Sequence, residues 1–152
     1  MKLTTEIGSL TLSNPTILAA GILGTTGASL KRVAGMGAGA VVTKSIGIEP
    51  KFGHHNPSLV KLEHGYLNAM GLPNPAYREF SQELTVARES KVPVIASIFG
   101  ATEDEFVEVA RGLLLAETAV EVGPQSTVAR IAGKLTNMVG VIDHVFECDA
   151  LR

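Results

Sequence analysis

Short apolar runs alternate with amphipathic stretches over the first 115 residues of the chain. The apolar runs contain β-branched residues and stop at glycine or at polar residues, which is typical of strands buried on both faces of a parallel sheet. Three such runs lie at residues 16–20, 40–43 and 92–98. Ahead of them, residues 6–13 roughly alternate apolar and polar side chains around Gly8-Ser9, which predicts a short β-hairpin or two edge strands.

A predicted helix follows each of the three runs. The first spans residues 28–36 after a turn at residues 24–27 that offers N-cap candidates. The second is predicted to begin with Asn74 as N-cap and Pro75 at the first helical position. Its predicted buried stripe is Tyr77, Phe80, Leu84 and Ala87.

The third predicted helix opens on a capping box at Thr102-Glu103-Asp104-Glu105. Its apolar face consists of Phe106, Val109, Ala110, Leu113 and Leu114. This alternation of strand and helix predicts right-handed βα units that build a parallel sheet, and therefore an α/β fold.

Two stretches depart from the alternation. Residues 46–73 are interpreted as one long loop, far above the usual length of about 4–6 residues, and such loops are functional or disordered. Beyond residue 115 the pattern blurs: residues 128–132 are compatible with a helix and residues 139–142 with a strand.

Composition narrows the class of protein. A chain of 152 residues with 45% hydrophobic residues can build the core of one domain. A net charge of −2 argues against a nucleic-acid partner. The single cysteine, Cys148, excludes an intrachain disulfide and favours a reducing compartment. Since neither a secretory signal nor a run of about 20 apolar residues is present, we expect a cytoplasmic protein without membrane contact.

Candidate chemistry lies where the predicted strands end, because ligands of parallel α/β folds bind at the carboxyl ends of strands. Gly21 either admits a flat ligand to the backbone or is a simple turn glycine. Lys44, before Ser45, either binds an anion or an electron-rich ring, or is a surface lysine with its stem along apolar surface. Ser97 either donates to a ligand or is a satisfied core hydroxyl.

The long loop carries the most distinctive string, residues 66–75. Asn68 offers a donor and an acceptor to an amide-bearing substrate, and the backbone around Gly71 could cradle a carboxylate, although an ordinary turn is the alternative. His54 and His55 lack the spacing of a zinc pair, so no metal site is predicted. Cys148 has no nucleophile signature around it and is interpreted as a structural thiol.

Four segments together resemble class 1 dihydroorotate dehydrogenase of the archaeal or bacterial type. They are Asn-Pro-Thr-Ile-Leu-Ala-Ala-Gly at 14–21, Val-Val-Thr-Lys-Ser at 41–45, Asn-Ala-Met-Gly-Leu-Pro-Asn at 68–74 and Pro-Val-Ile-Ala-Ser-Ile at 93–98. The resemblance implies a TIM (β/α)8 barrel that binds FMN and oxidises dihydroorotate to orotate in pyrimidine (UMP) biosynthesis. A class 1B member would also imply an iron–sulfur flavoprotein subunit as partner.

The resemblance also assigns roles to residues. It implies substrate contacts for Lys44, Asn68, Ala69, Met70, Gly71 and Leu72. It implies flavin contacts for Ala20, Gly21, Lys44, Ser45 and Ser97, the last standing where many members place an asparagine.

The likeness covers residues 1–113 and then fails. Residues 117–124 stand where the family has Asn-Leu-Ser-Cys-Pro, whose cysteine is the catalytic base, so no catalytic residue is assigned. Lys134, in Gly-Lys-Leu-Thr-Asn at 133–137, only faintly resembles a later flavin-contacting lysine. We therefore expect residues 1–115 to form the amino-terminal half of a barrel and residues 116–152 a divergent or truncated tail.

Three expectations follow for the chain by itself. It is inactive alone, it retains FMN weakly because the family's phosphate-binding strands come later, and it associates through exposed sheet edges. Two other functions stay open. One is a non-catalytic α/β interaction module, and the other is a TIM-barrel flavin oxidoreductase for another flat, amide-bearing ligand.

Overall fold

The centre of the protein is a five-stranded parallel sheet. The computed structural model describes residues 3–7, 10–114, 119–122 and 145–147. The strands are β3 (Ile17–Leu18), β4 (Ala40–Val42), β7 (Val94–Ile98), β8 (Ala119–Val122) and β9 (Val145–Glu147), and they lie side by side in that order. The order never reverses, which is how βα units wind in a barrel, whereas a doubly wound sheet has a switch point. The predicted parallel α/β architecture is confirmed.

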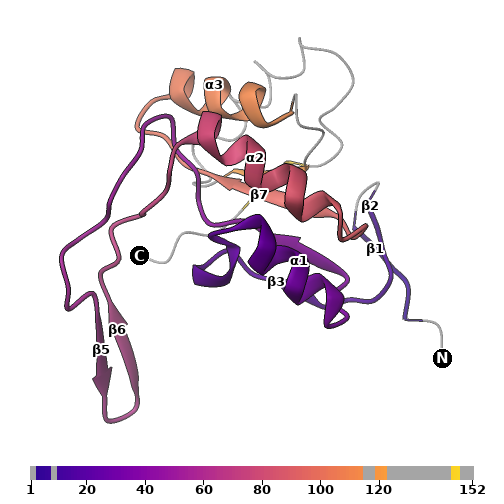
Figure 1. Ribbon diagram of the computed structural model, residues 1–152, viewed down its shortest axis with the longest axis horizontal. Helices are drawn as coiled ribbons and strands as arrows, with labels where there is room; N and C mark the ends of the chain where they lie inside the picture. The colour runs from indigo at the N-terminus through magenta and orange to yellow at the C-terminus, as the bar shows by residue number, and fades with distance from the viewer. Residues whose placement is uncertain (1–2, 8–9, 115–118, 123–144, 148–152) are drawn as a thin grey trace.

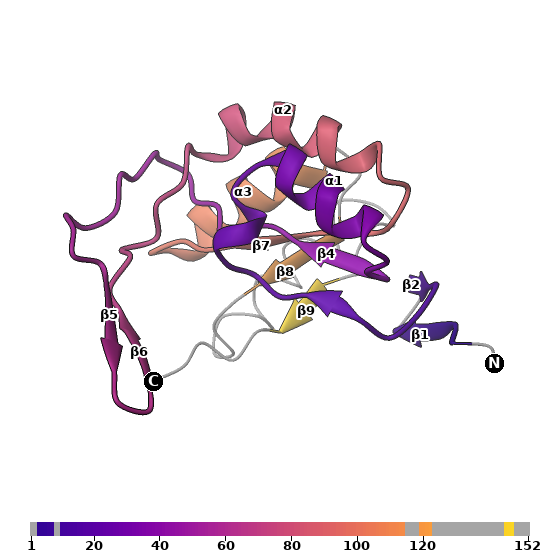
Figure 2. The same cartoon turned by 60° about the horizontal axis from the view of Figure 1, so that its bottom comes forward.

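Three helices cover one face of this sheet (Figure 2). They are α1 (Gly27–Gly35), α2 (Tyr77–Arg88) and α3 (Glu103–Leu114), and a 3-10 turn, η1 (Ile22–Gly24), precedes α1. Their apolar stripes meet the outward side chains of β4 and β7, and the buried cluster includes Leu30, Val41, Phe80, Leu84, Ala96, Ile98, Phe106 and Leu113. The predicted stripe of α2 faces the core, with Tyr77 only half-buried, and so do Phe106, Val109, Ala110 and Leu113 of α3.

A β-hairpin packs against the opposite face of the sheet. Its strands, β1 (Thr5–Ile7) and β2 (Leu10–Leu12), pair antiparallel, as residues 6–13 predict. Leu12 is fully buried against Ala40, Val42 and Ile95, side chains that alternate with those under the helices. The hairpin thus covers the face opposite the helices at one end of the sheet (Figure 1).

A second hairpin corrects the interpretation of residues 46–73 as one irregular loop. Strands β5 (Leu59–Leu62) and β6 (Gly65–Asn68) pair antiparallel and form an arm that projects from the sheet at the end away from β1 and β2 (Figure 1). An isolated antiparallel bridge lies at the base of the arm, where Lys51 and Asn74 exchange two backbone hydrogen bonds of 2.9 Å each. Within this segment, residues 59–68 therefore form a hairpin with a defined register.

Several element boundaries differ from the predicted ones. The first strand contains only Ile17–Leu18, and the second ends at Val42. The prediction that α2 starts at Asn74-Pro75 is wrong: its N-cap is Ala76, because the Asn74 side chain bonds to other backbone groups. Strands β8 and β9 were not predicted, and the predictions for residues 128–132 and 139–142 fall outside the described residues.

The capping box at α3 has an altered partner. The Thr102 hydroxyl accepts a hydrogen bond from the Glu105 N–H at 3.2 Å, as predicted. The Glu105 carboxylate, however, accepts from the N–H of Ala101 at 2.7 Å, one residue before the position expected for a capping box. The side chains of Thr102 and Glu105 therefore satisfy two backbone donors at the start of α3, those of Glu105 and Ala101.

Candidate functional site

Polar side chains gather where β4 and β7 end. Ser45 follows β4, Ser97 is the fourth residue of β7, and their hydroxyl oxygens lie 3.0 Å apart in a partly buried hydrogen bond. The buried Thr43 hydroxyl accepts the N–H of Ser97 at 3.0 Å and thereby fixes the spacing of the two strands. Each serine keeps acceptor capacity, and one hydroxyl proton of the pair remains to be donated to a ligand. Residue types alone gave no sign of the role of Thr43, because it depends on strand pairing.

Lys44 lies between these hydroxyls and the 3-10 turn η1. Its backbone N–H donates to the Gly24 carbonyl at 2.8 Å, and its side chain is half-buried. In the part of the chain that the structure describes, no carboxylate forms a salt bridge with its ammonium. A half-buried cation without a counter-ion favours an anionic or electron-rich ligand.

The backbone at Gly21 faces open space. A Cβ built there would meet only the Ala19 carbonyl oxygen, at 4.0 Å, and Ala20 beside it is exposed. This is compatible with a flat ligand lying against residues 20–21. The predicted flavin contacts of both residues stay predictions.

The string at residues 68–72 occupies the arm and its base. Asn68 is the last residue of β6, exposed and opposite Leu59, and the Ala69 N–H donates to the Ser58 carbonyl at 2.9 Å. The Met70 carbonyl accepts the His54 N–H at 3.1 Å. Gly71 and Leu72 both have positive φ, 75° and 52°, so the backbone turns sharply there.

Asn74 connects this string to the strand ends. Its side chain is buried and bonds to the backbone of three residues, Gly47, Leu72 and Ala76. Among the described residues, no hydrogen bond joins residues 68–72 directly to Lys44, Ser45 or Ser97. The bridging role of the Asn74 side chain was not predicted from the sequence, although an Asn-Pro pair that initiates a side-chain-closed turn is a usable signal.

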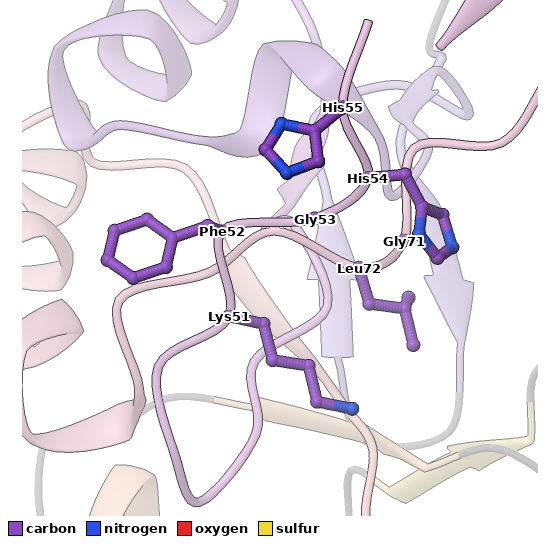
Figure 3. Close-up of a pocket in the computed structure, with 7 residues that line it drawn as sticks. All are labelled: Lys51, Phe52, Gly53, His54, His55, Gly71 and Leu72. Carbon is purple, nitrogen blue, oxygen red and sulfur yellow. The ribbon is translucent and has the colours of Figure 1, made fainter.

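An open hollow of about 790 Å³ lies at the base of the arm (Figure 3). Its lining residues are Lys51, Phe52, Gly53, His54, His55, Gly71 and Leu72. Figure 3 shows the His54 ring beside Gly71, whereas His55 and Lys51 point in different directions. Lys51 also lies over the Phe99 ring, 4.9 Å from its centroid. The basic side chains therefore do not converge on one point.

A flavin ring needs hydrogen-bond partners at its edge and a flat wall against its face. The hydroxyls of Ser45 and Ser97, the Lys44 ammonium and the open backbone at Gly21 supply hydrogen-bond partners and a flat wall, which fits the ring. The N-terminus of α1 does not offer a phosphate site, because the Glu83 carboxylate already accepts the Gly27 N–H there at 2.6 Å. The described residues thus suit the ring better than the phosphate.

Fold and site together define a parallel α/β protein with a candidate ligand site at the carboxyl ends of its strands. The family model of dihydroorotate dehydrogenase matches residues 2–123. Among curated proteins, the chain is 75% identical over 113 residues to a protein of Methanocella arvoryzae, a match that covers 74% of this chain and 38% of that protein. The chain belongs to the dihydroorotate dehydrogenase family.

Two further relatives support the assignment. A protein of Methanosarcina acetivorans is 69% identical over 114 residues and one of Methanocaldococcus jannaschii 50% over 113 residues, which covers 74% and 72% of this chain and 37% of each relative. All three relatives are named dihydroorotate dehydrogenase B (NAD(+)), catalytic subunit. The chain therefore spans less than two fifths of the length of these relatives.

Two residues considered in the sequence lie outside the described part of the chain. They are Cys148 and Lys134. None of the described helices combines the length and the apolar character needed to span a membrane.

Proposed function

We propose that this chain supplies the substrate loop and part of the flavin wall of a dihydroorotate dehydrogenase, which oxidises dihydroorotate to orotate in pyrimidine (UMP) biosynthesis. The supporting observations are the 75% identity over 113 residues and the family-model match over residues 2–123, a range that contains every candidate site residue. We further propose that its parallel βα units belong to a TIM barrel, in keeping with a strand order that never reverses.

FMN is the proposed cofactor. Ser45, Ser97, Lys44 and the backbone of residues 20–21 would hold its ring. Bound FMN would supply the hydride acceptor for the oxidation. Within this set Lys44 carries the one formal positive charge, and the remaining hydroxyl proton of the serine pair can add a hydrogen bond, so both can stabilise negative charge on the ring or on a substrate beside it.

The substrate is proposed to bind at residues 68–72. The Asn68 carboxamide offers both a donor and an acceptor, which matches the alternating N–H and C=O groups of a dihydropyrimidine ring. The positive φ values of Gly71 and Leu72 turn the backbone, so that neighbouring N–H groups can meet a carboxylate. The oxidation also requires removal of a proton from the adjacent carbon, and residues 117–124 lack the family's cysteine-containing base motif.

A partner subunit belongs to the same proposal. The relatives are named as catalytic subunits of a B-type, NAD(+)-linked enzyme, and such a name implies a second subunit. The sequence resemblance points to an iron–sulfur flavoprotein in that role, through which electrons would leave the flavin.

We expect the 152-residue chain by itself not to turn over dihydroorotate. A positioned base contributes about 10²–10⁴-fold to a proton transfer, and the family's base has no counterpart at residues 117–124. An assay with dihydroorotate, added FMN and a dye acceptor tests this. Turnover above the protein-free control that disappears in Cys148→Ala would identify Cys148 as the base and refute the expectation that the chain lacks one.

A chimaera tests the proposed site directly. The matching 113-residue segment of the Methanocella arvoryzae protein is replaced by the aligned segment of this chain, and FMN content and dihydroorotate oxidation are measured. We expect an active flavoprotein. In this background, Lys44→Ala should slow flavin reduction, and Asn68→Ala should weaken orotate binding by about tenfold, the effect of one lost hydrogen bond to an otherwise unsatisfied group.

Matched variants control for general damage. Lys61→Ala removes a lysine from an exposed position on the arm, and Asn56→Ala removes an asparagine from an exposed position ahead of it; both should leave these properties unchanged. A folded chimaera that binds FMN but does not oxidise dihydroorotate would overturn the proposed function.

A further inference from the structure

Asn74 is the most highly connected buried polar side chain near the candidate site. Only 7% of the residue is exposed. Its Oδ1 accepts the N–H of Gly47 at 3.2 Å and the N–H of Ala76 at 3.0 Å, and its Nδ2 donates to the Leu72 carbonyl at 3.0 Å. The backbone of Asn74 is occupied by the pair of hydrogen bonds with Lys51.

The two residues that Asn74 bonds within its own turn have disfavoured backbones. Leu72 has a φ of 52° and Ala76 a φ of 73°, and outside glycine such values are uncommon. A disfavoured conformation persists only where surrounding contacts over-determine it, and such positions cluster at ligand-binding and active sites. The Asn74 carboxamide supplies one such contact on each side.

The third bond of Asn74 leads to the sheet. Gly47 follows Ile46, and Ile46 is held by β7 through its N–H to the Ser97 carbonyl and its carbonyl to the Phe99 N–H. Asn74 therefore bridges the base of the arm, where Gly71 and Leu72 turn, and the segment that carries Lys44 and Ser45. One side chain couples two groups of candidate site residues that share no direct hydrogen bond among the described residues.

We propose that Asn74 is a positioning residue that holds the Leu72 carbonyl, and with it the backbone of residues 70–72, in register with the Lys44–Ser45 strand end for a planar, carboxylate-bearing ligand. The ligand part of this proposal rests on the proposed function; the geometric part does not.

Two substitutions separate the contributions of the three hydrogen bonds made by the Asn74 carboxamide. Asn74→Asp keeps an acceptor for Gly47 and Ala76 but removes the Nδ2 donor and faces the Leu72 carbonyl with a charge. Asn74→Ala removes all three bonds. A role limited to the start of α2 predicts that the aspartate variant resembles the wild type, whereas a positioning role predicts that residues 70–72 change in both variants.

NMR of the full chain reads out the geometry. In the wild type, we expect the positive φ of Leu72 to give a strong intraresidue NOE between HN and Hα, and one Asn74 Hδ2 proton to exchange slowly because it is bonded to the Leu72 carbonyl. We expect the Leu72 NOE to weaken in Asn74→Asp while the methyl signals of the buried Leu84 and Leu113 stay in place. An unchanged NOE in both variants overturns the proposal. If the variants unfold, a rapidly exchanging Asn74 Hδ2 pair in the wild type overturns it instead.

Orotate titration tests the ligand part. We expect Asn74→Asp to weaken binding by about tenfold, the effect of one lost positioning bond. Asn56→Asp places the same charge at an exposed position ahead of the arm and should leave binding unchanged. Equal weakening in both variants would indicate a simple charge effect and overturn the positioning role for the ligand.

The two proposals fail in different ways. If the wild-type chain does not bind orotate, the proposed substrate function is lost for this chain, and the Leu72 NOE still decides whether Asn74 positions the turn. If orotate binds equally well to the wild type and to Asn74→Asp, the substrate function stands and the positioning role for the ligand is refuted.

Discussion

Gly24, the last residue of η1, lies against the end of β4, where a side chain has no room. A Cβ built there would lie 2.5 Å from the Lys44 backbone nitrogen and 2.7 Å from the Val42 carbonyl oxygen, both parts of the backbone. The glycine is thus needed for close packing of η1 on the strand end, and Lys44 owes its place partly to this contact. A glycine at a turn is readable from sequence, but the strand that it contacts is not.

We predict that Gly24→Ala destabilises the fold and displaces Lys44. Forcing a methyl group into packed backbone costs about 1–3 kcal/mol. Gly35→Ala in α1 is the matched control, because a Cβ at Gly35 meets nothing within 4 Å and alanine favours the helix. Urea unfolding of the three proteins checks this, and equal midpoints for Gly24→Ala and the wild type would contradict it.

Tyr77 is predicted to ionise at a higher pH than an ordinary tyrosine. Burial raises its pKa above about 10, and its hydrogen bond to the Glu108 carboxylate, 3.0 Å long, raises it further, since a tyrosinate would face a negative charge. Because the folded state favours the neutral phenol, this contribution to stability is fully present below pH 10 and is lost as the pH rises through the raised pKa.

Absorbance at 295 nm measures this ionisation, because the chain has no tryptophan and only two tyrosines. In Tyr66→Phe, the remaining tyrosine should titrate above pH 10. Glu108→Gln should then lower the midpoint of that titration. A midpoint that does not respond to Glu108→Gln would show that the hydrogen bond is absent in solution.

At the scale of elements, the βα alternation was predictable because it depends on local periodicity and local caps. The arm was not. Glu63 and His64 join β5 to β6, and they lack the Asn-Gly or Asp-Gly pair that signals a tight hairpin. One face of the arm mixes Leu59, Lys61, Tyr66 and Asn68, and each strand has only four residues, so the period-2 pattern is too short to mark the strands.

Some residues of the candidate site could likewise be predicted from the sequence, and others could not. Lys44, Ser45 and Ser97 were predictable as strand-end residues, because parallel strands bring their carboxyl ends to one edge of a sheet. The connecting role of Asn74 was not, since Gly47 lies 27 residues earlier in the chain and the bond between them depends on how the arm folds back. The local prediction of a helix start at Asn74-Pro75 is wrong because the Asn74 side chain forms a tertiary hydrogen bond with Gly47 instead.

Helix α1 depends on a carboxylate from its neighbour. Glu83 of α2 accepts the Gly27 N–H at 2.6 Å, which satisfies a free donor and places a negative charge at the positive end of the helix dipole. We predict that Glu83→Gln destabilises the protein by about 1 kcal/mol. Glu49→Gln removes the same charge from an exposed loop and should have no effect. Equal urea midpoints for the two variants would contradict the role of Glu83.

At the scale of the whole molecule, the arm exposes an unusual amount of apolar surface. Leu59, Leu62, Tyr66 and Leu67 are between 50% and 67% exposed, and Phe52 at the base is fully exposed. An isolated two-stranded hairpin is marginally stable in water, and a contiguous apolar patch marks a contact surface. The register places Leu67 opposite Val60, with Leu62 on the same face of the ribbon.

We therefore predict that the chain does not remain a monodisperse monomer as its concentration rises. Apolar side chains on the arm and unpaired backbone groups at strand edges both favour association. The double variant Leu62→Lys, Leu67→Lys adds charge to one face of the arm and should shift the light-scattering mass toward the monomer. Met36→Lys, at an 81% exposed position off the arm, should not. A wild-type monomer at every concentration would show that the arm needs no partner, and a response to Met36→Lys alone would move the contact surface to α1.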